Sequence, residues 1–279
     1  MDTKDPARLS LLADLKMAIE QPEELLVYYQ PQVDLATDEI SGVEALVPWQ
    51  HPVRGLLAPD LFIPLAEGTG VIRPLTWWIL RAALQQNCLW AQDGVHLRVS
   101  VNISPRCLHE TGFADHVVQL LSETGVPTER LELELTETVI MIDPDRALAV
   151  LLDLAGRGIK LSIDGFGTGH SSLAYLKDLP VHEMKIDRSF ISGMGTESSD
   201  DSIVRSCLEL AHNLNLTVVA EGVETQEAWQ HLRDLGCPTV QGYFLSRPLP
   251  ASDFIRWLHS RKTGAREVAA TGSSRTVLG

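Results

Sequence analysis

Short apolar runs of strand length alternate with amphipathic helical stretches along most of the chain. The strand-like runs lie near Leu25–Gln32, Ile40–Trp49, Leu97–Ile103, Leu131–Glu137, Lys160–Asp164, Glu183–Ile186, Thr217–Glu221 and Val240–Leu245. Helical periodicity is found at Val71–Asp93, Phe113–Thr124, Pro144–Arg157, Ser202–Asn213 and Gln226–Leu235. Such alternation is typical of βα units around a parallel sheet. About eight strands in roughly 240 residues predict an α/β fold, a (β/α)8 TIM-like barrel, rather than an open sheet in two domains.

The connection between the first two predicted strands differs from the rest, because Ala36–Glu39 is short enough for a hairpin. Parallel neighbours need a longer crossover, so we expect the first strand to be antiparallel to the second. Residues 1–20 are expected to form a linker-like amphipathic helix, which either covers the bottom of the barrel or leads from an upstream domain. The barrel domain is expected over 21–260. A disordered tail, rich in Gly, Ser and Thr, is expected over 261–279.

Polar side chains recur where the predicted strands end. They are Glu44, Asn102, Glu134, Glu137, Asp164, Lys185, Asp187, Glu221 and Gln241. Burying a single carboxylate is costly, and packing gives no reason to place so many at strand ends. In a parallel barrel these ends converge on one face, where active sites lie. The pattern therefore predicts a cation-binding pocket on that face.

The residue types in this set favour a hard cation. The oxygen donors suited to Mg²⁺ or Mn²⁺ are Glu44, Asn102, Glu134 and Asp164. Lys185 is expected to steer or deprotonate a water, or to replace a cation, with Asp187 orienting it. Glu221 is a candidate for a second cation. These parts predict metal-assisted hydrolysis of a phosphate ester, although Asp187 and Glu137 could equally be helix caps or ion-paired groups.

Composition and charge limit the kinds of partner that the chain can bind. The net charge is −14, with no basic footprint, which argues against binding long nucleic acid but allows a small anion that reaches the site with cations. The four cysteines are scattered without a CxxC pair, which predicts reduced thiols. No apolar run approaches the ~20 residues of a membrane span, and the N-terminus lacks the apolar core of a signal peptide. We therefore expect a cytoplasmic protein with no membrane span.

A set of short motifs occurs in a fixed order along the chain. They are Tyr29-Gln-Pro31, Val43-Glu-Ala-Leu46, Trp49-Gln-His-Pro52, Phe62-Ile-Pro-Leu-Ala-Glu67, Val101-Asn-Ile-Ser104, Glu134-Leu-Thr-Glu137, Phe166-Gly-Thr-Gly169, Lys185-Ile-Asp187, Val219-Ala-Glu-Gly-Val-Glu224 and Gln241-Gly-Tyr243. Together they closely resemble the EAL domain family of bacterial cyclic di-GMP phosphodiesterases, over roughly Leu9 to Trp257.

The resemblance implies a barrel that opens cyclic di-GMP to the linear dinucleotide pGpG with Mg²⁺ or Mn²⁺. It implies metal binding by Glu44, Asn102, Glu134 and Asp164. It further implies that Lys185 and Glu221 serve the second cation and the attacking water, and that Glu137 holds the glycine-rich loop. The ligand-binding candidates are Gln30, Asp187, Glu224 and Gln241. A homodimer and an upstream GGDEF or sensor domain are the partners that the resemblance suggests.

Two positions depart from the family pattern. Gly165 stands where the family has a second aspartate that ligates the second metal, and Pro48 stands where it has an arginine that contacts a ligand phosphate. The loss of one charge-assisted contact weakens binding by ~1.5–3 kcal/mol. The loss of a metal ligand should reduce turnover more than binding. We therefore expect a weakened phosphodiesterase.

Two alternatives remain open at this point. The first is a catalytically inactive cyclic di-GMP receptor or regulatory module, which Gly165 and Pro48 favour. The second is a barrel glycosidase that uses Glu134 and Glu221 as acid and nucleophile. A chelator would distinguish the glycosidase, because hydrolysis by two carboxylates needs no metal.

Overall fold

The computed structural model describes residues 6–21, 23–136, 143–167, 176–194 and 198–272, without the side chains of Pro6, Ser198 and residues 262–272. Eight strands form a closed ring in the order β1, β2, β5, β6, β7, β8, β9, β10, because β10 pairs with β1. Their bounds are β1 (Tyr28–Asp34), β2 (Ile40–Leu46), β5 (Arg98–Asn102), β6 (Leu131–Thr136), β7 (Lys160–Phe166), β8 (Glu183–Ile186), β9 (Thr217–Ala220) and β10 (Thr239–Gln241). The predicted barrel is confirmed.

The first strand is antiparallel to both of its neighbours in the ring, as the short first connection predicts. The Asp34 carboxylate accepts hydrogen bonds from the backbone N–H groups of Ala36 and Thr37, at 3.0 and 2.8 Å, and so closes the hairpin. All other neighbouring strands of the ring are parallel. Two short additions complete the β-structure, the hairpin of β3 (Trp49–His51) with β4 (Gly55–Leu57), and β11 (Leu249–Pro250) beside β1.

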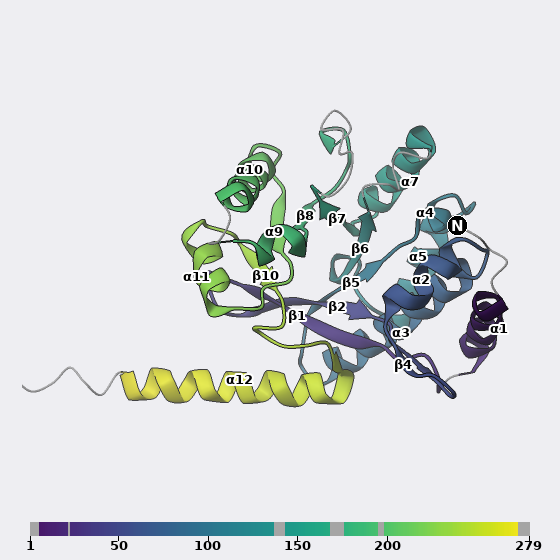
Figure 1. The fold of residues 1–279 in the computed structure, drawn as a ribbon, viewed down its shortest axis with the longest axis horizontal. Coiled ribbons are helices and arrows are strands. Elements are labelled where there is room, and N and C mark those ends of the chain that lie inside the picture. Colours follow the sequence, from purple (N-terminus) through teal and green to yellow (C-terminus); the bar gives the residue numbers. More distant parts are fainter. Residues whose placement is uncertain (1–5, 22, 137–142, 168–175, 195–197, 273–279) are drawn as a thin grey trace, which may run out of the picture.

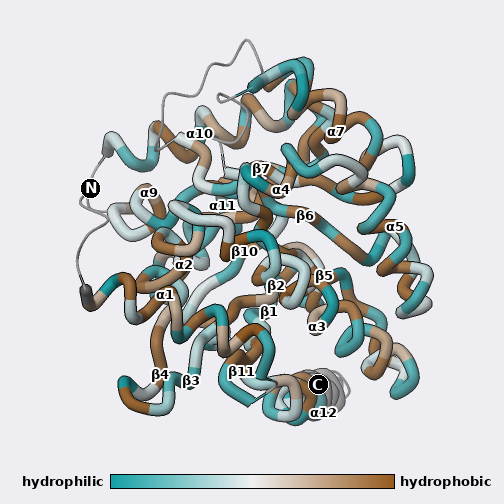
Figure 2. Tube along the Cα trace, turned by 90° about the vertical axis from the view of Figure 1, so that its right-hand side faces the viewer, coloured by the Kyte–Doolittle hydropathy of each residue, from teal (hydrophilic) through white to brown (hydrophobic). Residues whose placement is uncertain are grey.

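Helices surround the barrel (Figure 1). Their bounds are α1 (Pro6–Glu20), α2 (Pro59–Glu67), α3 (Ile72–Gln92), α4 (Pro105–Leu108), α5 (Phe113–Thr124), the 3₁₀ turn Thr128–Arg130, α7 (Pro144–Gly156), α9 (Arg188–Ser192), α10 (Ser198–Asn213), α11 (Gln226–Asp234) and α12 (Ala251–Gly272). Along α3, α5 and α7 apolar and polar positions alternate (Figure 2), as expected for helices with one face on a core. Within the described ranges, no helix combines the length and apolar character that crossing a bilayer requires.

The last helix runs along one edge of the molecule, and its C-terminal part extends beyond the barrel (Figure 1). Its bounds, Ala251–Gly272, cross the boundary predicted between 260 and 261. At the other end of the chain, α1 occupies most of the segment predicted as a linker-like helix. The division into 1–20, 21–260 and 261–279 stays a prediction about domain organisation.

Strand alternation places most apolar side chains outside the barrel and most polar side chains inside it; Val219, the register partner of Lys185, is an apolar exception. In β6, Leu131, Leu133 and Leu135 are buried in the apolar core, whereas Glu132 and Glu134 are buried on the opposite side of the strand. Each buried leucine contributes about 1.5–3 kcal/mol, so the outer layer stabilises the polar interior.

The inward side chains form two layers. We call the layer nearer the carboxyl ends of the parallel strands the site layer, and the layer nearer their amino ends the floor layer. The site layer consists of Gln30, Glu44, Asn102, Glu134, Asp164, Lys185, Glu221 and Gln241. The floor layer includes Gln32, Arg98, Glu132, Ser162, Glu183 and Thr217.

Candidate active site

A single ammonium group lies at the centre of the site layer. Lys185 Nζ lies 2.6 Å from Glu221 Oε1, 2.8 Å from Glu134 Oε2 and 3.3 Å from Glu44 Oε2. The Lys185 and Glu134 side chains have no exposed surface, and Glu44 and Glu221 are largely buried. These residues come from β8, β6 and β2 and from the residue that follows β9. Residues from non-adjacent strands can meet in this way only inside a closed barrel.

Strand register explains the convergence. Gln30 faces Glu44 across the β1–β2 pair, and Asn102 is the register partner of Glu134. The Glu221 N–H donates to the Ile186 carbonyl at 3.1 Å, which places Glu221 at the end of β9. The carboxyl ends of the parallel strands therefore meet on one face, as predicted.

Glu44 is held from three sides. Its Oε1 accepts from Asn102 Nδ2 at 2.8 Å, and its Oε2 accepts from Gln241 Nε2 at 2.5 Å as well as from Lys185. Gln241 also donates to Gln30 Oε1 at 3.1 Å. Gln30, Asn102 and Gln241, which were predicted from the sequence, therefore belong to one hydrogen-bonded group around Glu44.

The carboxylates of this group repel one another. Burial, together with repulsion from Glu44, raises the pKa of Glu134 well above its ordinary value. Burial also raises the pKa of Asp164 and raises that of Glu221 to about 7. Burial opposes the charge on Lys185, but attraction to Glu134 and Glu221 outweighs it and raises the pKa of the lysine. The lysine is therefore protonated at neutral pH, and the site has more acidic side chains than one ammonium can neutralise.

The donor set fits a hard divalent cation. In the part of the chain that the structure describes, no group of three or more His, Cys, Asp or Glu side chains is arranged to hold a metal as it stands. The Lys185 ammonium lies between the glutamates instead. Glu134 Oε1 is buried and has no hydrogen-bond partner among the described residues, so one carboxylate oxygen still lacks a donor or cation. Oxygen donors and uncompensated negative charge are the properties that Mg²⁺ and Mn²⁺ sites share.

Asp187 and Glu224, both predicted to bind ligand, lie on the connections that follow β8 and β9. The Asp187 carboxylate accepts a hydrogen bond from the Ser189 N–H at 2.8 Å and caps α9. This contact is the helix cap that the sequence allowed as an alternative to a role in the site. Glu224 is exposed. Glu137, predicted to be catalytic, lies outside the described residues.

The two positions that depart from the family pattern follow site-layer residues in the chain, Gly165 after Asp164 and Pro48 four residues after Glu44. Gly165 follows Asp164 directly, has a φ of +70° and donates its backbone N–H to the Asp164 carboxylate. Pro48 is buried shortly after β2, and its carbonyl accepts from the Leu26 N–H at 3.1 Å. Neither residue offers a side-chain oxygen or a charge.

The floor layer was not predicted as a polar cluster. Arg98 Nη1 lies 2.8 Å from Glu132 Oε2, and Arg98 Nη2 lies 3.0 Å from Glu183 Oε2. Burial and repulsion from Glu183 raise the pKa of Glu132 to about 8. The alternation Glu132-Leu-Glu134 was the available signal, because residues two apart on a strand share a face.

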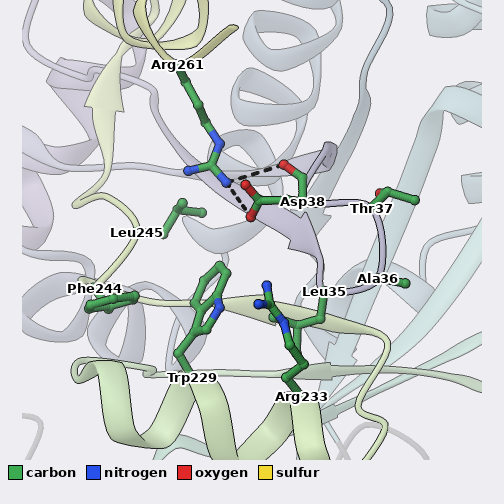
Figure 3. Close-up of a pocket in the computed structure, with 9 residues that line it drawn as sticks. All are labelled: Leu35, Ala36, Thr37, Asp38, Trp229, Arg233, Phe244, Leu245 and Arg261. Carbon is green, nitrogen blue, oxygen red and sulfur yellow. Dashed lines mark hydrogen bonds and ion pairs between the residues drawn. The ribbon is translucent and has the colours of Figure 1, made fainter. Parts of the chain in front are cut away.

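A separate pocket of about 840 Å³ lies outside the ring (Figure 3). It is bordered by the β1–β2 connection, α11, the segment after β10 and α12, and it includes none of the predicted site residues. In it, Arg261 Nη2 lies 2.7 Å from an Asp38 carboxylate oxygen, which ties α12 to the hairpin.

The sequence and the fold were compared with known proteins. A family model described as "EAL domain" matches residues 12–248, and the chain therefore belongs to the EAL domain family. The bifunctional diguanylate cyclase/cyclic di-GMP phosphodiesterase MucR of Pseudomonas aeruginosa is 42% identical over 257 residues, 91% of this chain and 37% of MucR. The cyclic di-GMP phosphodiesterase NbdA of the same organism is 41% identical over 92% of this chain and 33% of NbdA. The chain thus spans about a third of these relatives.

Solved structures agree with the family assignment. The PaMucR phosphodiesterase, in its complex with c-di-GMP, is 42% identical with a TM-score of 0.84, and the match covers 88% of this chain and 99% of that one. The EAL domain of Mycobacterium smegmatis DcpA is 34% identical with a TM-score of 0.73, covering 86% of this chain and 98% of that one.

Proposed function

We propose that this chain hydrolyses cyclic di-GMP to pGpG with the help of a divalent cation, Mg²⁺ or Mn²⁺. The observation that carries the proposal is the buried cluster of Glu44, Glu134 and Glu221 around the single cationic group of Lys185. The names of MucR, NbdA and the PaMucR complex support the choice of substrate. The glycosidase alternative is not favoured, because the Lys185 ammonium contacts both glutamates that would have to act as acid and nucleophile.

The residues that would hold the cation are Glu44, Asn102, Glu134 and Asp164. A bound divalent cation would supply Lewis-acid stabilisation of the charge that develops on the phosphate oxygens. Gln241 and Asn102 orient the Glu44 carboxylate by donating to its two oxygens. The side chains thus form a fixed set before any ligand binds, and pre-organisation of this kind reduces the cost of reaching the transition state.

Glu221 and Lys185 have different parts in the proton chemistry. Glu221 lies 2.6 Å from the Lys185 ammonium, and when a bound cation keeps its carboxylate ionised it accepts a proton from the attacking water. Lys185 has a raised pKa and remains protonated, so it stabilises negative charge and orients groups but does not deprotonate water. The water oxygen attacks phosphorus, the bond from phosphorus to the 3′ oxygen breaks, and that oxygen takes up a proton, which leaves a 5′-phosphate on pGpG.

The residues at positions 165 and 48, Gly165 and Pro48, are the reason to expect slow hydrolysis. At Gly165 there is no side-chain oxygen for a second cation, and at Pro48 there is no cation for a ligand phosphate. The proposed roles of Glu137 in the glycine-rich loop, and of Gln30, Asp187, Glu224 and Gln241 in the nucleotide pocket, rest on the family motifs. A receptor without activity is the second candidate function, and Gly165 is the observation that favours it.

The wider setting of the chain is also a proposal. The relatives are longer, which supports an upstream GGDEF or sensor domain as a partner, and a homodimer is proposed from the family resemblance. A cytoplasmic location is proposed because all four cysteines are free thiols.

Single-turnover hydrolysis is the experiment that tests the main proposal. Protein in excess over cyclic di-GMP is incubated with Mn²⁺ or Mg²⁺, with a chelator control and with a Glu134→Gln variant, and pGpG is quantified. Metal-dependent pGpG from the wild type alone supports the phosphodiesterase. Absence of product together with retained cyclic di-GMP binding would replace it with the receptor, and absence of both would reject both functions.

A further inference from the structure

The floor layer and the site layer are joined by a chain of side-chain amides. Arg98 Nη2 donates to Gln32 Oε1 at 3.4 Å, and Gln32 Nε2 donates to Gln241 Oε1 at 3.1 Å. Gln241 Nε2 then donates to Glu44 Oε2 and to Gln30 Oε1. Gln32 has no exposed surface and Gln241 is almost fully buried, so bulk water does not compete for the bond between them, whereas the Arg98 side chain is 23% exposed.

Each amide in this chain has two possible orientations, because its oxygen and nitrogen are nearly the same size but have opposite hydrogen-bonding roles. Arg98 offers only donors, and Glu132 and Glu183 hold it from the other side at 2.8 and 3.0 Å. An arginine held in this way requires the Gln32 oxygen to face it, which turns the Gln32 amino group toward Gln241. The Gln241 oxygen then faces Gln32, and the Gln241 amino group faces Glu44.

The lack of a side chain at Gly42 in β2 leaves room for the Gln32 amide oxygen to face Arg98. A Cβ atom built at Gly42 would lie 3.0 Å from Gln32 Oε1 and 3.2 Å from the Arg98 carbonyl oxygen. A larger residue at Gly42 would press on the oxygen that accepts from Arg98. The glycine thus leaves room for the lowest link of the amide chain.

We propose that Gln32, oriented by Arg98, is a positioning residue that determines which end of the Gln241 amide faces Glu44. With the amino end toward it, the carboxylate is held by a donor; with the oxygen toward it, two acceptors would repel, and Glu44 would turn away from its place beside Lys185. The inference rests on the proposed function only insofar as Glu44 binds a cation. Outer partners that orient a metal ligand typically change metal affinity by about 10–100-fold when removed.

The test is a double-mutant cycle on Mn²⁺ affinity, measured by calorimetry without cyclic di-GMP. The variants are Gln32→Met, Gln241→Met and both together, since methionine keeps most of the side-chain volume. We expect Gln32→Met to weaken Mn²⁺ binding roughly 10-fold, and the double variant to be no weaker than Gln241→Met alone, because Gln32 acts through Gln241. Val117→Ala, which truncates a buried residue of α5, is the control for a general loss of stability.

Several outcomes would overturn the inference. One is additive effects of the two substitutions on Mn²⁺ affinity, and another is a Gln32→Met affinity within twofold of the wild type. A third is an equal loss of Mn²⁺ affinity in Val117→Ala, provided that Val117→Ala and Gln32→Met unfold at the same urea concentration. A wild type that binds no Mn²⁺ would overturn it as well, because there would be no ligand geometry to set. A wild type that binds Mn²⁺ but makes no pGpG would reject the proposed function and leave this cycle to be judged on affinity alone.

Discussion

Two cationic groups lie inside the barrel in different surroundings, the fully buried Lys185 ammonium and the partly buried Arg98 guanidinium. In the site layer, the Lys185 ammonium contacts three carboxylates, and Asp164 adds a fourth acidic group nearby. In the floor layer, the Arg98 guanidinium contacts two carboxylates and a glutamine. Lysine is a compact point charge, whereas the planar arginine directs several donors at fixed angles.

The two layers differ in how far their carboxylates are compensated by positive charge. In the floor layer one guanidinium faces two carboxylates. It donates to Glu183 and lies 2.8 Å from Glu132, while both Glu132 oxygens and Glu183 Oε1 lack a hydrogen-bond partner among the described residues. The site layer gathers four acidic side chains around one ammonium, and Glu134 Oε1 likewise lacks a donor there. Both layers have more carboxylates than cationic groups, but the excess is larger in the site layer, so we expect added positive charge to enter there.

The largest effect should come from removing the central lysine. Lys185→Met leaves buried carboxylates without their cation, so without metal the free energy of unfolding should fall by about 3–5 kcal/mol. Mn²⁺ should restore much of this loss, because it replaces the missing charge. Hydrolysis should fall by about 10²–10³-fold even with Mn²⁺, because a group that stabilises developing negative charge is lost. Urea denaturation with and without Mn²⁺ and single-turnover assays provide the measurements.

Arg98→Met is the matched variant in the floor layer. It should destabilise the protein by a similar amount, but Mn²⁺ should not restore its stability. If Mn²⁺ restored the free energy of unfolding equally in Lys185→Met and Arg98→Met, or in neither variant, the two layers would not differ in their capacity for a cation.

A second large effect should come from adding a carboxylate to the site layer. Gly165→Asp supplies the missing oxygen ligand and should raise metal-dependent hydrolysis by about 100-fold, roughly 2.7 kcal/mol in the barrier. The φ of +70° strains a side chain at this position, although Asp and Asn tolerate it better than most residues. Gly165→Asn shares the strain without the charge and is the control. If the rate with Asp does not exceed that with Asn at saturating metal, the missing carboxylate is not the cause of slow turnover.

Pro48→Arg should act on binding more than on turnover. The backbone role of Pro48 is to accept a hydrogen bond from the Leu26 N–H, and any residue can keep that carbonyl contact. An arginine that reaches a ligand phosphate should tighten cyclic di-GMP binding by about 10–100-fold. Calorimetry in chelator, which prevents turnover, measures this effect. Pro48→Leu releases the same backbone constraint without charge, and a similar gain in that variant would contradict the phosphate contact.

The two layers should also differ in how their contributions to the free energy of unfolding depend on pH. A raised pKa means that the folded protein binds the proton more tightly, so its contribution is complete below the unfolded value near 4.5 and is lost as pH rises to about 7 for Glu221 and about 8 for Glu132. Without metal, the free energy of unfolding should therefore fall between pH 5 and 8 by at most about 1.4 kcal/mol per unit for each group.

Mg²⁺ should remove the Glu221 contribution, because the cation keeps that carboxylate ionised, and should leave the Glu132 contribution in place. Urea denaturation at several pH values, with and without Mg²⁺, measures both slopes. Parallel curves with and without Mg²⁺ would show that no cation enters the site layer.

The sequence predicted the barrel because strand length and alternation are local properties. Glu44, Asn102 and Glu134 lie at one end of the barrel, as their spacing indicated, since the carboxyl ends of parallel strands must meet. The short Ala36–Glu39 connection was enough to predict the antiparallel first strand. These features follow from spacing along the chain.

The floor layer could not be predicted in the same way. Arg98 meets Glu183 across strands that are not neighbours in the sheet, and Gln32 meets Gln241 only because β10 closes on β1. Such contacts depend on the stagger with which the ring closes, and local patterns do not encode it. Pairs of polar residues two apart on one strand gave a sign that a second polar layer lay inside; they are Gln30/Gln32, Glu132/Glu134, Ser162/Asp164 and Glu183/Lys185.

The smallest effect should come from an ion pair outside the barrel. Arg261 and Asp38 lie 2.7 Å apart in the pocket of Figure 3, with 28% and 58% of their side chains exposed. Exposed pairs are screened by water and salt, so Arg261→Gln should lower the free energy of unfolding by no more than about 1 kcal/mol, and less at high salt. Hydrolysis and Mn²⁺ affinity should not change. A loss comparable with that of Lys185→Met would mean that attachment of α12 to the hairpin, rather than the buried charges, controls the stability of the barrel.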